Sequence, residues 1–154
     1  MPKAANGFSL TEVLITTAIL GTLTSIAVPN YIAQLCRSES VEAESTIASL
    51  KAIISAYVDE TGALPTNWSQ LNSISAIMSN NGQMSGGFAE TMTLPNENYE
   101  ITVSGPTNST YNLTAVRVDG CPNRDINACL DVSTGASDLT RGDGTTNAAV
   151  PNCS

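Results

Sequence analysis

The first third of the chain is dominated by a long apolar run. From Phe8 to Val28 there are 21 residues, and Glu12 is the charged residue among them. As a helix at about 1.5 Å per residue, the run would span roughly 31 Å, close to the hydrocarbon thickness of a bilayer. The pattern therefore predicts a membrane-spanning helix that carries an acid near its start, where an ionised carboxylate is costly.

Beyond Pro29 the apolar positions recur at helical spacing. They are Ile32, Leu35, Ala43, Ile47, Leu50, Ile54 and Tyr57. Three glutamates are expected on the outward faces of this segment: Glu39, Glu42 and Glu44. Gly62 followed by Pro65 is typical of a helix end. We predict one helix from about Leu10 to Asp59, a length that suits a packed assembly rather than a small monomer.

The C-terminal part shows the period-two alternation of strands. Strands are predicted at Tyr99–Ser104, Tyr111–Asp119 and Ala128–Ser133, with Met92–Leu94 beside them, a turn at Gly105–Thr110 and a short helix around Leu71–Met78. One face of the small antiparallel sheet would cover the Ala43–Tyr57 face of the helix. The expected fold class is α+β: a long N-terminal helix packed on a small sheet, with a disulfide-stapled C-terminal region.

Composition narrows the function. The net charge of the 154-residue chain is −8, so direct binding of a nucleic acid phosphate backbone is disfavoured. Histidine, the commonest general base and metal ligand, is absent. Without a nucleophile–base motif or a metal-ligand cluster, we expect no catalytic residue, no resident metal and no cofactor, and hence no enzyme.

The N-terminus does not follow the order of an ordinary secretory signal. The short polar stretch MPKAANG precedes the apolar run, and no A-x-A cleavage pattern follows it. The small residue Gly7 lies before the run, so cleavage there would leave the apolar segment in the mature protein. Lys3 would hold that end in the cytoplasm and place the rest of the chain outside, where disulfides persist.

These residues resemble the type IV pilin family, which includes the pseudopilins of type II secretion. The likeness is carried by a charged leader ending in Gly7, then Phe8 and Glu12, with Gly21 and Pro29 where many pilins have Gly and Pro. It is specific over about Lys3–Tyr31 and weaker over Tyr57–Leu71. Thr11, where Ile is frequent, is a departure, as is the high threonine content of the run.

The resemblance implies a processing pathway and a set of partners. A prepilin peptidase would cut after Gly7 and methylate the amine of Phe8. The subunit would wait in the bacterial inner membrane, and the assembly machinery would then add it, with other pilins, to a helical homopolymer on the cell surface. The expected division is leader 1–7, filament-core helix 8–29, amphipathic helix 30–60 and head 61–154. Adhesion, motility and DNA uptake are the implied roles of the filament.

Glu12 has two interpretations. The first pairs it with the amine of Phe8, within the chain at i and i+4 or across subunits, where it would set the register of assembly. Removing one member of a buried pair costs about 3–5 kcal/mol, which suits such a device. In the second, Glu12 is a carboxylate that snorkels at the membrane edge.

The segment Gly21–Pro29 also has two interpretations. Its weak helix formers predict either local unwinding in a filament or a simple proline kink.

Four cysteines, Cys36, Cys121, Cys129 and Cys153, predict disulfides in an exported chain. The expected pairing is Cys121 with Cys129 and Cys36 with Cys153; the alternative is a free Cys36 and a different pair in the tail. The tail Ser133–Ser154 is expected to be a surface loop that is held by its last cysteine.

Two motifs and three functions remain open. Asn123, Asp125 and Asn127 resemble part of a calcium loop that lacks its downstream glutamate, and Arg141–Asp143 is an RGD triplet best explained by chance.

The leading function is a filament subunit. The alternatives are a minor pilin or a pseudopilin, and a membrane-tethered binding module that does not polymerise.

Overall fold

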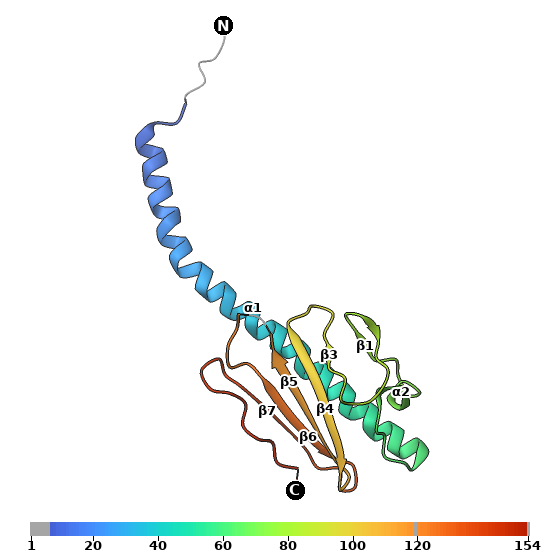
Figure 1. The fold of residues 1–154 in the computed structure, drawn as a ribbon. Helices are drawn as coiled ribbons and strands as arrows, with labels where there is room; N and C mark the ends of the chain where they lie inside the picture. Colours follow the sequence, from blue (N-terminus) through green and yellow to red (C-terminus); the bar gives the residue numbers. More distant parts are fainter. Residues whose placement is uncertain (1–6, 119, 154) are drawn as a thin grey trace. The chain divides into compact units, whose positions relative to one another are not determined.

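The computed structural model describes residues 7–118 and 120–153. It divides into two compact units, one ending at Arg37 and the other beginning at Ser38, which are described separately below. Figure 1 shows the order of elements along the chain. The long helix α1 runs over Leu10–Thr61, which confirms the predicted helix and extends it by two residues. At its end Gly62 has a φ of 68° and donates its N–H to the Val58 carbonyl, as a left-handed C-terminal glycine does.

The part of α1 in the first unit is apolar on all sides. Its large side chains are exposed around the whole circumference, among them Leu14, Ile19, Leu23 and Ile26. A helix that is hydrophobic all round is suited to a membrane or to burial among other helices. By length and composition, α1 contains a segment that could cross a membrane.

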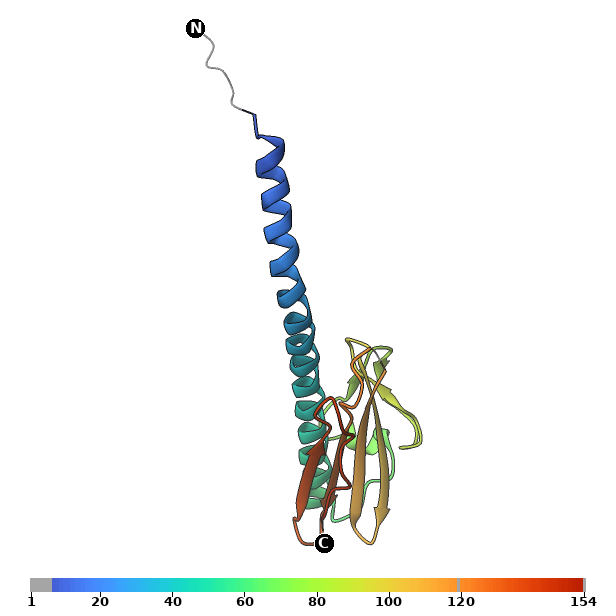
Figure 2. The same ribbon diagram turned by 90° about the vertical axis from the view of Figure 1, so that its left-hand side faces the viewer.

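The second unit holds a five-stranded antiparallel sheet in the order β3-β4-β5-β6-β7. The strands are β3 (Met92–Thr93), β4 (Tyr99–Thr107), β5 (Thr110–Arg117), β6 (Ile126–Asp131) and β7 (Ser137–Arg141). Each strand pairs with its neighbour in sequence, so the sheet is a simple meander. Figure 2 shows it lying along the C-terminal part of α1.

The core forms where one face of the sheet meets one stripe of the helix. The helix contributes Ala43, Ile47, Leu50, Ile54 and Tyr57. The sheet contributes alternate residues of its three long strands: Tyr99, Ile101, Val103, Tyr111, Leu113, Ala115, Ile126, Ala128 and Leu130. Every one of these side chains is buried, as the two sequence periods predicted, and the α+β class is confirmed.

The smaller elements differ from the expectation. The short helix is α2 (Trp68–Leu71), capped by Asn67, whose side chain accepts from the Gln70 N–H; the prediction at Leu71–Met78 was wrong. The segment after α2 instead forms a two-stranded hairpin, β1 (Met78–Ser79) and β2 (Gly82–Gln83). Asn67 is a strong N-cap residue, which explains why the helix starts earlier.

The β4–β5 hairpin closes around Asn108 and Ser109, whose φ angles of 48° and 68° are those of a two-residue turn that matches the strand twist. The sheet register shifts between Ser104 and Thr107. At that irregularity Gly105 has a φ of 120°, and a Cβ there would meet the Thr110 carbonyl oxygen at 2.7 Å. Strand β4 extends three residues past its predicted end at Ser104, into the segment Gly105–Thr110 that was predicted to be a turn.

Strand β7 was missed. It lies inside the tail that was expected to be a loop, where half-buried residues replace a clear alternation. Strand β6 was predicted two residues too late. The predicted end of the second strand, Asp119, lies outside the described residues, and the structure ends β5 at Arg117.

Candidate functional site

The predicted processing site lies ahead of the helix. Gly7 and Phe8 precede the first residue of α1, and the Phe8 side chain is 88% exposed. Apart from Gly7 itself and its two neighbours in the chain, no atom of the described residues lies within 4 Å of the position that a Cβ on Gly7 would occupy. A peptidase could therefore reach the bond between the two residues. The rest of the proposed leader, residues 1–6 with Lys3, lies outside the described residues.

Glu12 begins the helix through a capping box. Its Oε2 accepts the N–H of Ser9 at 2.8 Å, and the Ser9 hydroxyl accepts the N–H of Glu12 at 3.2 Å. This reciprocal pair satisfies two of the backbone donors that a helix start leaves unpaired. Ser-x-x-Glu before an apolar run is the usual signal of this cap, and the prediction for Glu12 did not include Ser9. The cap engages Oε2 of the carboxylate, and the second oxygen, Oε1, takes no part in it.

The predicted loose segment Gly21–Pro29 is helical throughout. Hydroxyl groups along the run donate to carbonyls three or four residues earlier: Thr16, Thr17, Thr22, Thr24 and Ser25. Pro29 has no N–H to donate to the carbonyl of Ser25, so the ladder is weakened there by its covalent structure. Apart from its chain neighbours and the nearby backbone of the helix itself, no atom lies within 4 Å of the place where a Cβ on Gly21 would stand, which leaves a smooth point on the helix surface.

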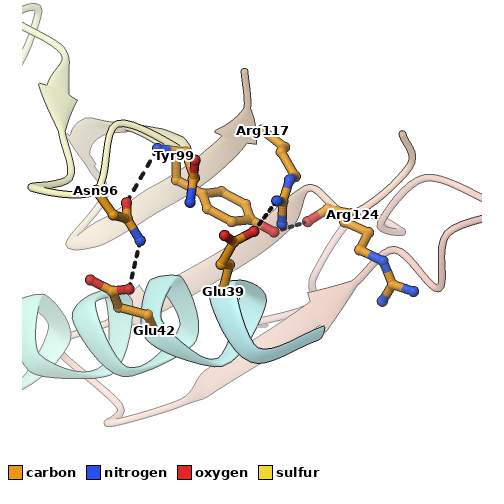
Figure 3. Close-up of polar contacts among 7 residues, drawn as sticks. Glu39, Glu42, Asn96, Tyr99, Arg117 and Arg124 are labelled. Atoms are coloured by element: carbon orange, nitrogen blue, oxygen red, sulfur yellow. Dashed lines mark hydrogen bonds and ion pairs between the residues drawn. The ribbon is translucent and has the colours of Figure 1, made fainter. Parts of the chain in front are cut away.

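A buried ion pair joins the helix to the sheet in the second unit. Glu39 on α1 pairs with the guanidinium of Arg117 at the end of β5 (Figure 3). The Arg117 side chain is 2% exposed and that of Glu39 is 19% exposed. The guanidinium carbon lies 5.2 Å from the centre of the Tyr99 ring, within reach of a cation–π interaction. The expectation that Glu39 faces outward was wrong.

The other two glutamates of this helix segment also contact residues of the sheet or of the loops between its strands. Glu42 accepts from the side-chain amide of Asn96 at 2.6 Å, and Glu44 pairs with Arg141 at 3.0 Å. The helical spacing of apolar residues could not predict these contacts, because it identifies the buried stripe of the helix and not the partners of the polar residues at its edges. A charged residue next to the stripe can be outward or paired, and only the position of the sheet decides between them.

The cysteines pair differently from the prediction. Cys129 on β6 forms a disulfide with Cys153, so both the predicted Cys121–Cys129 and Cys36–Cys153 bonds are wrong. Cys36 and Cys121 are disulfide-bonded as well. The alternative of a free Cys36 therefore fails too. The nearness of Cys121 and Cys129 in sequence was misleading because Cys129 lies on the face of β6 that the tail crosses.

The tail lies across the outer face of β6 and β7. The side-chain amide of Asn127 donates to the Ala148 carbonyl, and the Thr140 hydroxyl donates to that of Ala149 at 2.5 Å. Asp138 Oδ2 accepts the N–H of Asn152 at 2.8 Å. With the disulfide, these contacts bind the tail at several points. The predicted attachment through Cys153 is confirmed, but it is one of several.

The motif residues have structural partners. Asn123 donates to the Thr145 carbonyl, and Asp125 accepts the N–H of Arg117. Asp143 of the RGD triplet accepts from Thr145 and Thr146, and these hydrogen bonds hold the pKa of its carboxyl well below the usual value. Within the described part of the chain, no group of three or more His, Cys, Asp or Glu residues is placed to hold a metal ion.

Comparison with known proteins adds an independent observation on the N-terminal segment. Residues 2–28 match the family described as the prokaryotic N-terminal methylation motif. The fimbrial protein EcpC of Eikenella corrodens is 33% identical to this chain over 67 residues, which cover 44% of each protein. The matched part therefore spans less than half the length of that relative. No solved structure matches the chain.

Proposed function

We propose that this chain, a type IV pilin-like protein with a prepilin methylation motif, is a structural subunit of a type IV pilus. Cleavage after Gly7 would free the amine of Phe8, and the chain would polymerise through its N-terminal helix with copies of itself and other pilins. In this proposal Glu12 sets the register between neighbours. Adhesion, motility and DNA uptake are the roles we assign to the filament, with a minor pilin or a pseudopilin as the alternative subunit type.

The observation that carries the proposal is the unpacked apolar surface of the first unit. Its large side chains, Leu14 at 60% and Ile26 at 66% exposed among them, have no partner within the described chain that buries them. Exposed apolar area of this extent is unfavourable in water, by about 25 cal/mol per Å². A bilayer before assembly and neighbouring helices after it would both remove that area from water.

The capping box sharpens the role of Glu12. Apolar contacts are not directional, so they permit helices to slide past one another. A carboxylate that already holds the helix start has a fixed orientation. Its second oxygen could accept a hydrogen bond from the Phe8 amine of a neighbouring subunit. A pair of opposite charges in a water-poor filament interior selects one axial offset between the two helices.

Three variants separate the charge of Glu12 from its capping role. Glu12→Gln keeps an acceptor at the third helical position and so preserves the capping box, but it removes the charge. Glu12→Ala removes both. Ser9→Ala removes the cap, at a cost of about 1 kcal/mol, and keeps the charge.

We expect Glu12→Gln and Glu12→Ala to be processed at Gly7 and to fail in assembly, while Ser9→Ala forms filaments. Mass analysis of the mature N-terminus reports processing and methylation of Phe8. The amount of sheared surface filament reports assembly, and electron microscopy of purified filaments tells a bulk subunit from a rare one. Normal filaments from Glu12→Gln would refute the charge pairing, and a chain that stays a membrane-tethered monomer would refute the filament function.

A further inference from the structure

The apolar stripe of the helix does not by itself determine how the helix sits on the sheet within the second unit. Ala43, Ile47, Leu50 and Ile54 form the centre of the contact. Because apolar burial depends on area and not on direction, a helix held by such a stripe can turn or slide by small amounts at little cost. Polar contacts at the edges of the stripe can remove that freedom, since a hydrogen bond requires a defined distance and angle.

Polar contacts follow both edges of the stripe. At about 100° per residue, Glu39 and Glu42 project to one side of the buried centre, and Glu44 and Lys51 project to the other. On the first side the partners are Arg117 at the end of β5 and Asn96 in the loop before β4. On the second side both partners belong to β7: Arg141 and Ser137.

The arginines on the two sides differ in burial, while the glutamate side chains are similarly exposed, at 19% for Glu39 and 22% for Glu44. Arg117 has a 2% exposed side chain, whereas that of Arg141 is 63% exposed. Exposed ion pairs contribute little to stability and allow their long side chains to move.

Residues of the strands and of a loop surround the Arg117 side of the buried pair. The guanidinium of Arg117 lies over the Tyr99 ring, and the Tyr99 hydroxyl donates to the Arg124 carbonyl at 2.9 Å (Figure 3). The backbone N–H of Arg117 donates to Asp125 Oδ1 at 3.0 Å. The acceptor site for Glu39 is therefore held in place by strand and loop together.

We propose that the Glu39–Arg117 pair determines the rotation and axial register of α1 on the sheet, and that its contribution is specificity rather than stability. Desolvation offsets much of the attraction in a buried pair, so an apolar pair of similar volume can be as stable. A single buried polar contact is known to select one register where apolar packing allows several. A second consequence rests on the proposed function: in a filament subunit, the same pair fixes the orientation at which the head surfaces repeat along the filament.

The test compares single and double replacements in the full chain, solubilised in detergent. Glu39→Leu leaves the buried Arg117 guanidinium without Glu39, and Arg117→Met leaves the half-buried Glu39 carboxylate without Arg117. Glu39→Leu/Arg117→Met replaces the pair by apolar groups. The control is Glu44→Leu/Arg141→Met at the exposed pair. Nitroxide labels on noncanonical amino acids at the exposed positions Ala52 and Thr102 report the distance from helix to sheet and leave the four cysteines untouched.

We expect each single variant to unfold at a lower temperature and the double variant to recover the wild-type midpoint or exceed it. The label-to-label distance of the double variant should broaden or shift, and its filament yield should fall, while the control keeps the wild-type distance and yield. A double variant with a wild-type distance distribution would overturn the inference, as would one that is no more stable than the singles. If wild-type chains form no filaments, the proposed function fails, yet the distance measurement still decides the register claim.

Discussion

Replacing Tyr111 by phenylalanine removes one hydroxyl from the centre of the head. The side chain is fully buried, its ring stands edge-on to that of Phe88, and its hydroxyl donates to the Pro65 carbonyl at 2.8 Å. Tyr111→Phe keeps the ring and leaves that carbonyl without this donor. A buried polar group that loses its partner costs about 1–3 kcal/mol. For a domain of this size, that corresponds to a fall in Tm of roughly 4–12 °C.

The same hydroxyl makes stability depend on alkaline pH. Burial, and secondarily the nearby Tyr57, raises the pKa of Tyr111 from 10.0 to about 12. Because the folded-state pKa is the higher one, the neutral phenol's contribution to stability is fully present below pH 10 and is lost as the pH rises through about 12. The difference in unfolding free energy between wild type and Tyr111→Phe should therefore shrink over that interval.

The assay is urea unfolding of the full chain in detergent, followed by near-UV circular dichroism at about pH 8 and at steps up to about pH 12, the range over which the phenol titrates. Tyr31→Phe, at a residue that is 69% exposed, is the matched control, and it should leave stability unchanged at the lower pH. Equal stability of Tyr111→Phe and wild type at that pH would refute the role of the hydrogen bond. A constant difference between them over the whole range would refute the burial argument for the pKa.

Two further predictions concern the tail. Replacing both Cys129 and Cys153 by alanine should lower the unfolding free energy by about 3.5 kcal/mol in the chain-entropy model, because the bond spans a sequence separation of 24. Urea unfolding measures this loss, and a loss below about 1 kcal/mol would contradict the prediction. Hydrogen bonds from the N–H groups of Asn152 and Leu139 lower the pKa of Asp138 below its usual 3.8, so its stabilising contribution is present above that pH and is lost as the pH falls through the lower folded-state pKa. The protection factor of the Asn152 amide, which is the exchange rate of an unstructured peptide at the same pH divided by the rate at Asn152, should fall on acidification in wild type, and in Asp138→Asn it should be lower already at neutral pH. Equal protection factors in both proteins at neutral pH would rule out this contact.

Local patterns were sufficient for the long elements. The apolar run from Phe8 and the spacing of Ala43, Ile47 and Leu50 identified α1, because a helix period repeats many times over 52 residues. The alternation in Tyr99–Val103 identified β4 for the same reason. Gly62 marked the helix end correctly, since the left-handed conformation there is one that glycine adopts without cost.

Short or half-buried elements were beyond such patterns. Strand β7 has five residues with no clear alternation, because the tail covers its outer face and the helix edge covers part of the other. The short helix was misplaced because Asn67, a capping residue, was not weighed against the apolar spacing further on. For β7 the deciding contacts come from residues that are distant in sequence, whereas the cap of α2 is a local contact between Asn67 and Gln70.

Residues a few positions apart are enough to limit what this chain can be: an apolar helix with an acid at its start, followed by an amphipathic helix and a meander of strands. Which cysteines meet, and which partner each of the three helix glutamates takes, depended instead on the packed fold. Such contacts join positions as distant as Glu39 and Arg117, and their formation requires the sheet to place each partner beside the helix.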